Sequence, residues 1–72
     1  MKTVSVKFTN YYRSYAYTTK LNLVVGKCYK ITANNAAYST PVVVEGYIDH
    51  GPEGIILKEI TNAIEITEDD HH

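Results

Sequence analysis

Apolar and polar residues alternate at the start of the chain, and this pattern predicts β-strands. An apolar residue occupies every second position from Val4 to Phe8, which is the period of a strand that buries one face. Tyr15 and Tyr17 repeat the alternation after a turn over residues 9–12. We therefore expect a second strand that pairs antiparallel with the first.

The middle of the chain predicts a third strand between two loops. Residues 21–26 place apolar side chains in a loop that ends at a glycine, and Tyr29 and Ile31 then alternate with polar residues. Asn34 and Asn35 follow, and asparagine tolerates the backbone geometry of tight turns. We expect this strand to end in a polar hairpin loop.

A valine-rich fourth strand is predicted to begin at Thr40 and Pro41, because proline lacks the amide hydrogen that a strand interior requires. Gly46 marks the place where a small barrel needs a bend or a bulge. The expected buried face carries Val42, Val44, Gly46 and Ile48, and the expected polar face carries Glu45, Tyr47 and Asp49.

The end of the chain is predicted to add one or two further strands. Residues 50–54 are rich in turn formers, and we expect a fifth strand over residues 55–60. A short turn and a last strand around Ile64 and Ile66 are expected next, with a helix over residues 61–67 as the alternative.

Together these elements predict an all-β fold. We expect a small antiparallel barrel of five or six strands, SH3-like or OB-like, because closure removes the exposed strand edges that promote aggregation. Residues 1–67 are expected to form this single domain, since a chain of 72 residues leaves no room for a second one. Residues 68–72 are expected to form a frayed acidic tail, in which His71 and His72 are either native or part of a purification tag.

The order of motifs from Tyr15 to Ile48 resembles a known group of barrels. The motifs are Tyr15-x-Tyr17, Leu21-x-Leu23-x-Val25-Gly26 and Tyr29-x-Ile31, followed by the valine strand. This order resembles that of small SH3-like barrels encoded in many phage genomes and, more distantly, that of the N-terminal DNA-binding barrel of primosomal helicase PriA. The resemblance covers about half of the chain and implies an SH3-like fold and a phage origin. Lys27 and residues 34–37 depart from that pattern, and no residues here match the PriA pocket for a DNA 3′ end.

Composition argues against a secreted, membrane-spanning or metal-stabilised protein. Cys28 is the only cysteine, so no internal disulfide can form, and the Cys and His spacings of zinc sites are absent. The N-terminal residues lack the apolar block of a signal peptide, and the longest apolar runs are far shorter than the ~20 residues that span a membrane. We expect a cytoplasmic protein without a cofactor.

Two residue sets contain the side chains that catalysis or metal binding needs, and neither is complete. Cys28, His50 and Asp49 have the types of a nucleophile, a base and an orienting group, but nothing in the sequence brings Cys28 near the turn that contains His50. Asp49, His50 and Glu53 are metal-ligand types in an exposed turn without a full ligand set. We therefore expect neither enzyme activity nor a bound metal.

Charge is distributed unevenly along a chain whose net charge is −1. Every charged residue before Glu45 is basic, and Lys58 is the only lysine or arginine after it. Cations neutralise phosphates and aromatic rings stack on bases, so one hypothesis is a surface for single-stranded nucleic acid. Its candidate residues are Tyr11, Tyr12, Arg13, Lys27 and Lys30. The competing interpretation is that Tyr15, Tyr17 and Tyr29 fill the core and that strand pairing mixes the two halves in space.

A second hypothesis is protein binding, which we favour by a small margin. Tyrosine and arginine are frequent at the hot spots of interfaces. The candidates, which lie in predicted turns or on a polar strand face, are Tyr11, Tyr12, Tyr38 and Tyr47. The resemblance to phage barrels makes a host protein the expected partner. A third hypothesis is a structural module that forms homo-oligomers through open strand edges.

Overall fold

Six β-strands form the regular structure of the part of the chain that the structure describes. The computed structural model describes residues 1–49, 51 and 54–66, so the predicted tail over residues 68–72, with His71 and His72, lies outside the described residues. The strands are β1 (Lys2–Phe8), β2 (Ser14–Thr19), β3 (Cys28–Ala33), β4 (Ala36–Ala37), β5 (Val42–Ile48) and β6 (Glu59–Ile66).

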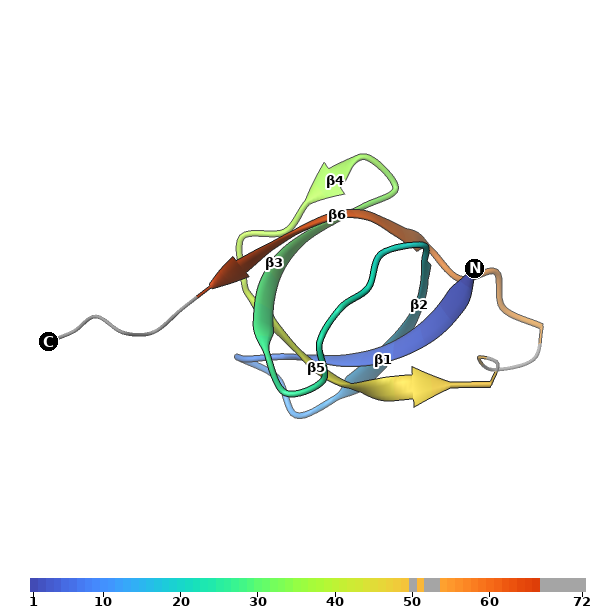
Figure 1. Cartoon of the computed structure of the whole chain (residues 1–72), viewed down its shortest axis with the longest axis horizontal. Helices are drawn as coiled ribbons and strands as arrows, with labels where there is room; N and C mark the ends of the chain where they lie inside the picture. The colour runs from blue at the N-terminus through green and yellow to red at the C-terminus, as the bar shows by residue number, and fades with distance from the viewer. Residues whose placement is uncertain (50, 52–53, 67–72) are drawn as a thin grey trace, which may run out of the picture.

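Five of these strands close into a barrel. β1 pairs antiparallel with β2 on one side and with β5 on the other, and β3 pairs antiparallel with β5 and β6. A parallel contact between β2 and β6 completes the ring, while β4 lies outside it as the second strand of a hairpin with β3 (Figure 1). The predicted all-β fold, a small barrel of the SH3-like or OB-like kind, is confirmed.

The core is one cluster of aliphatic side chains and tyrosines inside the barrel. Buried residues alternate with more exposed ones along β1 and β3, as the sequence predicts. The loop over residues 20–27 crosses one end of the barrel (Figure 1) and contributes a buried leucine. The buried hydrophobic residues are Val4, Val6, Tyr17, Leu23, Tyr29, Ile31, Ala33, Val42, Val44 and Ile60.

The hairpin between β3 and β4 forms at the predicted asparagines. Asn34 and Asn35 both have positive φ angles, of 50° and 68°. A two-residue hairpin turn of type I′ needs positive φ at both central positions, and asparagine tolerates that conformation better than most residues do. The prediction of a polar hairpin loop at this point is confirmed.

A β-bulge in β5 lies where the sequence predicts a bend. Ser5 is opposite Gly46, whereas the next residue, Val6, is opposite Val44. Glu45 is therefore an extra residue without a partner in β1, which is the arrangement of a bulge. The expectation of a bend or bulge at Gly46 is confirmed.

The bulge makes the predicted faces wrong in the second half of β5. Tyr47, predicted on the polar face, is 39% exposed, but it lies opposite the buried Val4 and therefore on the interior side of the sheet. Its hydroxyl donates to the Leu23 carbonyl (2.7 Å) and accepts from the Leu23 N–H (2.8 Å). Ile48, predicted on the buried face, is 40% exposed. Both errors have one cause, because an extra residue reverses the alternation of side chains beyond it.

The last strand begins later and runs further than the sequence predicts. Residues 55–58 lie outside regular structure, and Ile56 is 97% exposed. β6 then runs without a turn to Ile66 and pairs with β3 along its length. The predicted strand over residues 55–60 is wrong except for its last two residues. The predicted turn before Ile64 and the helical alternative are also wrong. The bounds of this strand are set by its pairing with β3, and the spacing of apolar residues within it does not reveal them.

We expect Ile60→Ala to destabilise the barrel strongly, because Ile60 is fully buried where β6 meets β2. Removing a buried isoleucine side chain costs about 2–5 kcal/mol. Urea unfolding followed by circular dichroism measures the loss. Ile64→Ala is the matched control on the same strand: its side chain is 62% exposed, so the change should stay within about 0.5 kcal/mol. Equal effects of the two substitutions would contradict the register of β6.

Candidate binding groove

An open groove lies at one end of the barrel, between β2 and the segment that leads into β6. Its volume is about 550 Å³. Aromatic and aliphatic side chains make up most of its surface, and we call it the aromatic groove. The residues that line it are Phe8, Asn10, Tyr11, Tyr15, Ala16, Tyr17, Tyr38, Ser39, Thr40, Ile55, Ile56, Leu57 and Lys58.

Three aromatic rings form one wall of the aromatic groove. The Phe8 ring stacks on the Tyr38 ring, with centroids 5.5 Å apart and planes 22° apart. Tyr15 meets Phe8 edge-on, at 5.6 Å and 87°. These are the two arrangements that aromatic pairs prefer. The Tyr38 N–H also donates to the Ile31 carbonyl (3.0 Å), so the wall is attached to the barrel backbone.

Tyr17 lies buried beneath this wall. It is two residues from Tyr15 on β2, so both side chains point to the interior face of the barrel. Burial raises the pKa of the Tyr17 phenol well above its ordinary value, and the neighbouring Tyr38 and Tyr15 side chains act in the same direction. The phenol therefore stays neutral at any physiological pH.

The opposite wall is the irregular segment of residues 55–58. Ile55 and Ile56 are strongly exposed, whereas Leu57 is half-buried. The segment joins the barrel at Lys58, whose carbonyl accepts a hydrogen bond from the Thr18 N–H (3.0 Å). The large apolar side chains of Ile55 and Ile56 are thus exposed to solvent at the edge of the aromatic groove.

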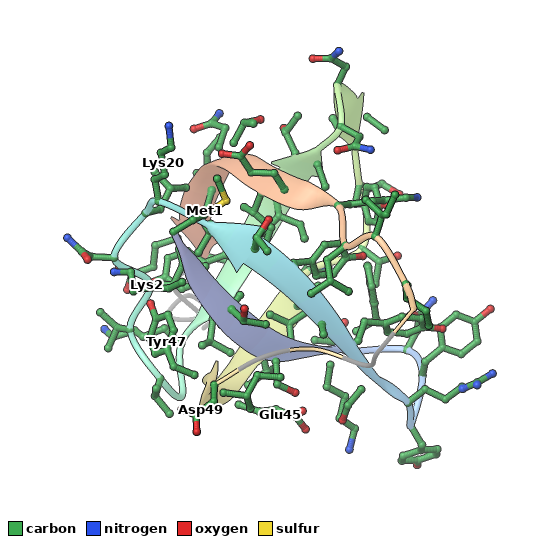
Figure 2. All side chains as sticks on the ribbon, turned by 90° about the vertical axis from the view of Figure 1, so that its right-hand side faces the viewer. Met1, Lys2, Lys20, Glu45, Tyr47 and Asp49 are labelled. Carbon is green, nitrogen blue, oxygen red and sulfur yellow. The ribbon has the colours of Figure 1, made fainter. Side chains whose placement is uncertain are left out.

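Of the four tyrosines that the sequence suggests for protein binding, two line the aromatic groove and two do not. Tyr11 and Tyr38 line the aromatic groove. Tyr12 does not line it: its side chain is 94% exposed, and the Lys7 ammonium lies 5.3 Å from the centre of its ring. Tyr47 is bonded to Leu23 in the loop that crosses the barrel, and the Lys2 ammonium lies 5.3 Å from its ring centre (Figure 2).

The residues nominated for nucleic acid binding lie on different parts of the barrel. Tyr11, Tyr12 and Arg13 share the loop between β1 and β2, whereas Lys27 and Lys30 belong to the start of β3 and the loop before it. In the closed ring, β2 and β3 are separated by β6 on one side and by β1 and β5 on the other. The structure brings the first three residues together and does not join them to the two lysines.

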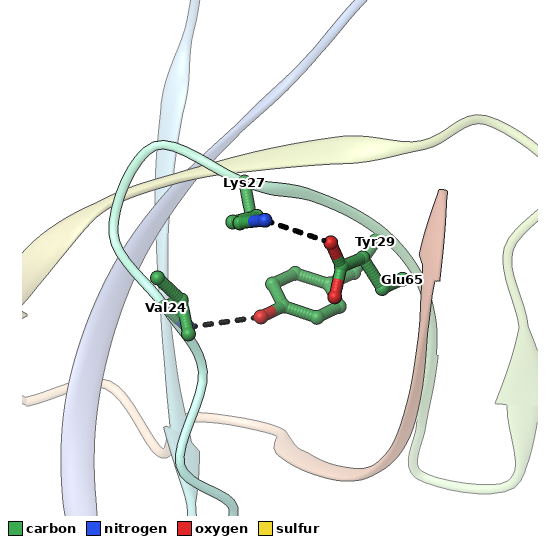
Figure 3. A network of polar contacts seen from close by, with 4 residues as sticks. All are labelled: Val24, Lys27, Tyr29 and Glu65. Carbon is green, nitrogen blue, oxygen red and sulfur yellow. Dashed lines mark hydrogen bonds and ion pairs between the residues drawn. The ribbon is translucent and has the colours of Figure 1, made fainter. Parts of the chain in front are cut away.

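Lys27 is engaged in an ion pair. Its ammonium lies 3.0 Å from a Glu65 carboxylate oxygen on β6 (Figure 3). The hydrogen bond to Glu65 and the charge of that carboxylate raise the pKa of Lys27. In the same network the Tyr29 hydroxyl accepts a hydrogen bond from the Val24 N–H (2.9 Å). Both side chains of the ion pair are exposed, and pairs of this kind contribute little to stability.

Strand pairing also mixes the basic and acidic halves of the chain. Glu45 of β5 lies beside β1, where it accepts a hydrogen bond from the Ser5 hydroxyl (2.9 Å). Hydrogen bonds from Ser14 and Ser5, together with the charge of Lys7, lower the pKa of Glu45. Figure 2 shows basic Lys2 on the same side of the barrel as acidic Glu45. The charge asymmetry of the sequence does not persist as two separate faces.

The residues considered for catalysis or metal binding fall partly outside the described chain. Cys28 is half-buried in β3 and Asp49 is exposed after β5, while His50 and Glu53 lie outside the described residues. Within residues 1–49, 51 and 54–66, no group of three or more potential metal-ligating side chains occurs. The same residues include no helix long and apolar enough to cross a membrane.

Comparison with known proteins adds no relative. No protein-family model matches the sequence, and neither the curated proteins nor the solved structures give a significant match.

Sequence reasoning missed several residues of the aromatic groove. Phe8 and Tyr15 were expected to serve as strand and core residues, and residues 55–57 were expected to form a strand. One signal was present in the sequence: Ile55, Ile56 and Leu57 are consecutive apolar residues after a glycine. They lack the alternation that a half-buried strand would show.

We expect the stability of the protein to fall above about pH 10, the ordinary pKa of tyrosine. The pKa of Tyr17 is raised on folding, so the unfolded chain loses this proton at a lower pH than the folded one. The protonated Tyr17 phenol contributes fully to the stability of the fold below about pH 10. Above that pH the contribution is lost, by up to about 1.4 kcal/mol per pH unit. Urea unfolding across this range measures it. Tyr17→Phe should flatten the dependence and the exposed control Tyr12→Phe should not; an unchanged slope in Tyr17→Phe would refute the assignment.

Proposed function

We propose that this chain is a non-catalytic binding protein whose aromatic groove receives an apolar segment of a partner protein. The observation that carries the proposal is the groove itself. Stacked rings of Phe8 and Tyr38 face a wall in which Ile55 and Ile56 are exposed to solvent. Contiguous exposed apolar surface is rare on small soluble proteins except at interaction sites. Concave apolar clefts with a few polar groups are the usual form of such sites.

The charges of the groove favour a protein over a nucleic acid. Of the described residues that line it, Lys58 alone is charged. Binding of single-stranded nucleic acid draws most of its affinity from several cations along the backbone. Here the net charge of the chain is −1, and Lys27 is already paired with Glu65.

The same features define the chemistry of the partner. Apolar side chains of the partner would pack against the Tyr38 and Tyr15 rings, and an acidic residue would complement Lys58. The resemblance to phage-encoded barrels supports a cytoplasmic host protein as the source of this segment. Self-association through Ile55 and Ile56 is the competing explanation for their exposure.

A library of random linear peptides displayed on a surface tests the proposal. We expect the selected peptides to carry apolar residues and at least one acidic residue. Fluorescence anisotropy of the labelled peptides should then show that Tyr11→Ala weakens binding at least about tenfold, as expected for an aromatic hot spot. Tyr12→Ala is the matched control, because this adjacent tyrosine does not line the groove. It should change affinity less than about twofold, below the range of hot spots.

Four outcomes would contradict the proposal. Enrichment of no peptide, or equal effects of the two tyrosine substitutions, would show that the groove is not a peptide site. Salt-sensitive binding of single-stranded oligonucleotides that Arg13→Ala and Lys30→Ala both weaken would favour nucleic acid instead. A concentration-dependent dimer that Ile56→Asp disrupts would favour self-association.

A further inference from the structure

One edge of β2 is unpaired where it borders the aromatic groove. Along its full length β2 pairs with β1. On its other side the ladder with β6 covers only Thr18 and Thr19. The ladder does not extend into the chain before β6, because residues 55–58 lie outside regular structure. Within the described residues, no strand lies opposite the segment from Ser14 to Tyr17 on that side.

The backbone groups at this edge point toward the groove. The Thr18 N–H donates to the Lys58 carbonyl, so it points away from β1. Successive N–H groups of a strand alternate in direction, so the N–H of Ala16 also points away from β1, whereas those of Tyr15 and Tyr17 point toward it. Ala16 itself lines the aromatic groove.

The side chains around this edge suit an added strand. Tyr15 and Tyr17 face the barrel interior, so they do not cover the edge, and the small Ala16 side chain leaves its backbone accessible. A strand laid here would direct alternate side chains to opposite faces. One set would enter the aromatic groove, and the other would face outward beyond the barrel.

We infer that the partner segment binds as an extra β-strand along Ser14–Tyr17 of β2, with its backbone bonded to Ala16 and its alternate apolar side chains in the aromatic groove. The inference rests on the proposed function and specifies its binding mode. Strand addition to an open edge draws affinity from the main chain and specificity from pockets for alternate side chains. The ligand class is an extended peptide with apolar residues at every second position and an acidic residue near Lys58.

Amide hydrogen exchange of the free protein tests the edge directly. We expect the Ala16 amide to exchange at least about tenfold faster than those of Tyr15 and Tyr17, because only the latter two point into the ladder with β1. Addition of a selected peptide should slow exchange at Ala16 and leave the two tyrosine amides nearly unchanged. An Ala16 amide that is already protected in the free protein would overturn the inference.

Backbone methylation of the peptide tests the binding mode. Each residue of a selected peptide is N-methylated in turn, which removes one N–H and leaves the side chains in place. We expect losses of about tenfold at alternate residues, since only every second N–H would face β2. Retained affinity in every methylated peptide would overturn strand addition while the groove remained a peptide site. Selection of no peptide at all would overturn the proposed function and this inference with it.

Discussion

The closure of the barrel by β6 is the constraint on which the rest of the structure depends. A chain of this size has a thin core, and with a single cysteine it has no internal disulfide to stabilise that core. β6 completes the enclosure through a long antiparallel ladder with β3 and a short parallel contact with β2. Ile60 is fully buried at this junction, and its carbonyl accepts a hydrogen bond from the equally buried Thr19 hydroxyl (3.0 Å).

The open edge of β2 follows from the same closure. Five strands in a ring cannot all be antiparallel to their neighbours, because an odd number leaves one pair that runs in the same direction. In this barrel that pair is β2 and β6, and it extends over only two residues of each strand. The irregular residues 55–58 that lead into β6 do not continue this ladder, and the aromatic groove and the unpaired backbone edge of β2 lie beside them.

Tyrosine has opposite roles in the two parts of the barrel. Where the loop over residues 20–27 crosses the barrel, the Tyr47 and Tyr29 hydroxyls bond the Leu23 and Val24 backbone, which satisfies polar groups that the loop would otherwise leave without partners. In the aromatic groove, Tyr15 and Tyr38 present their rings to a cleft that the described residues do not fill. This contrast supports a binding role for the aromatic groove.

Local alternation was sufficient to predict β1, β2, β3 and the start of β5. Each of these strands has one face on the core, so an apolar residue recurs at every second position in its sequence. The bulge position at Gly46 was also predictable, but the reversal of Tyr47 and Ile48 depends on the register with β1. The bounds of β6 depend on pairing with β3, far away in the sequence. Of the groove, Tyr11 and Tyr38 were anticipated as candidates for binding. The groove as a whole required the tertiary structure, because closure of the ring brings together side chains from segments that share no local pattern.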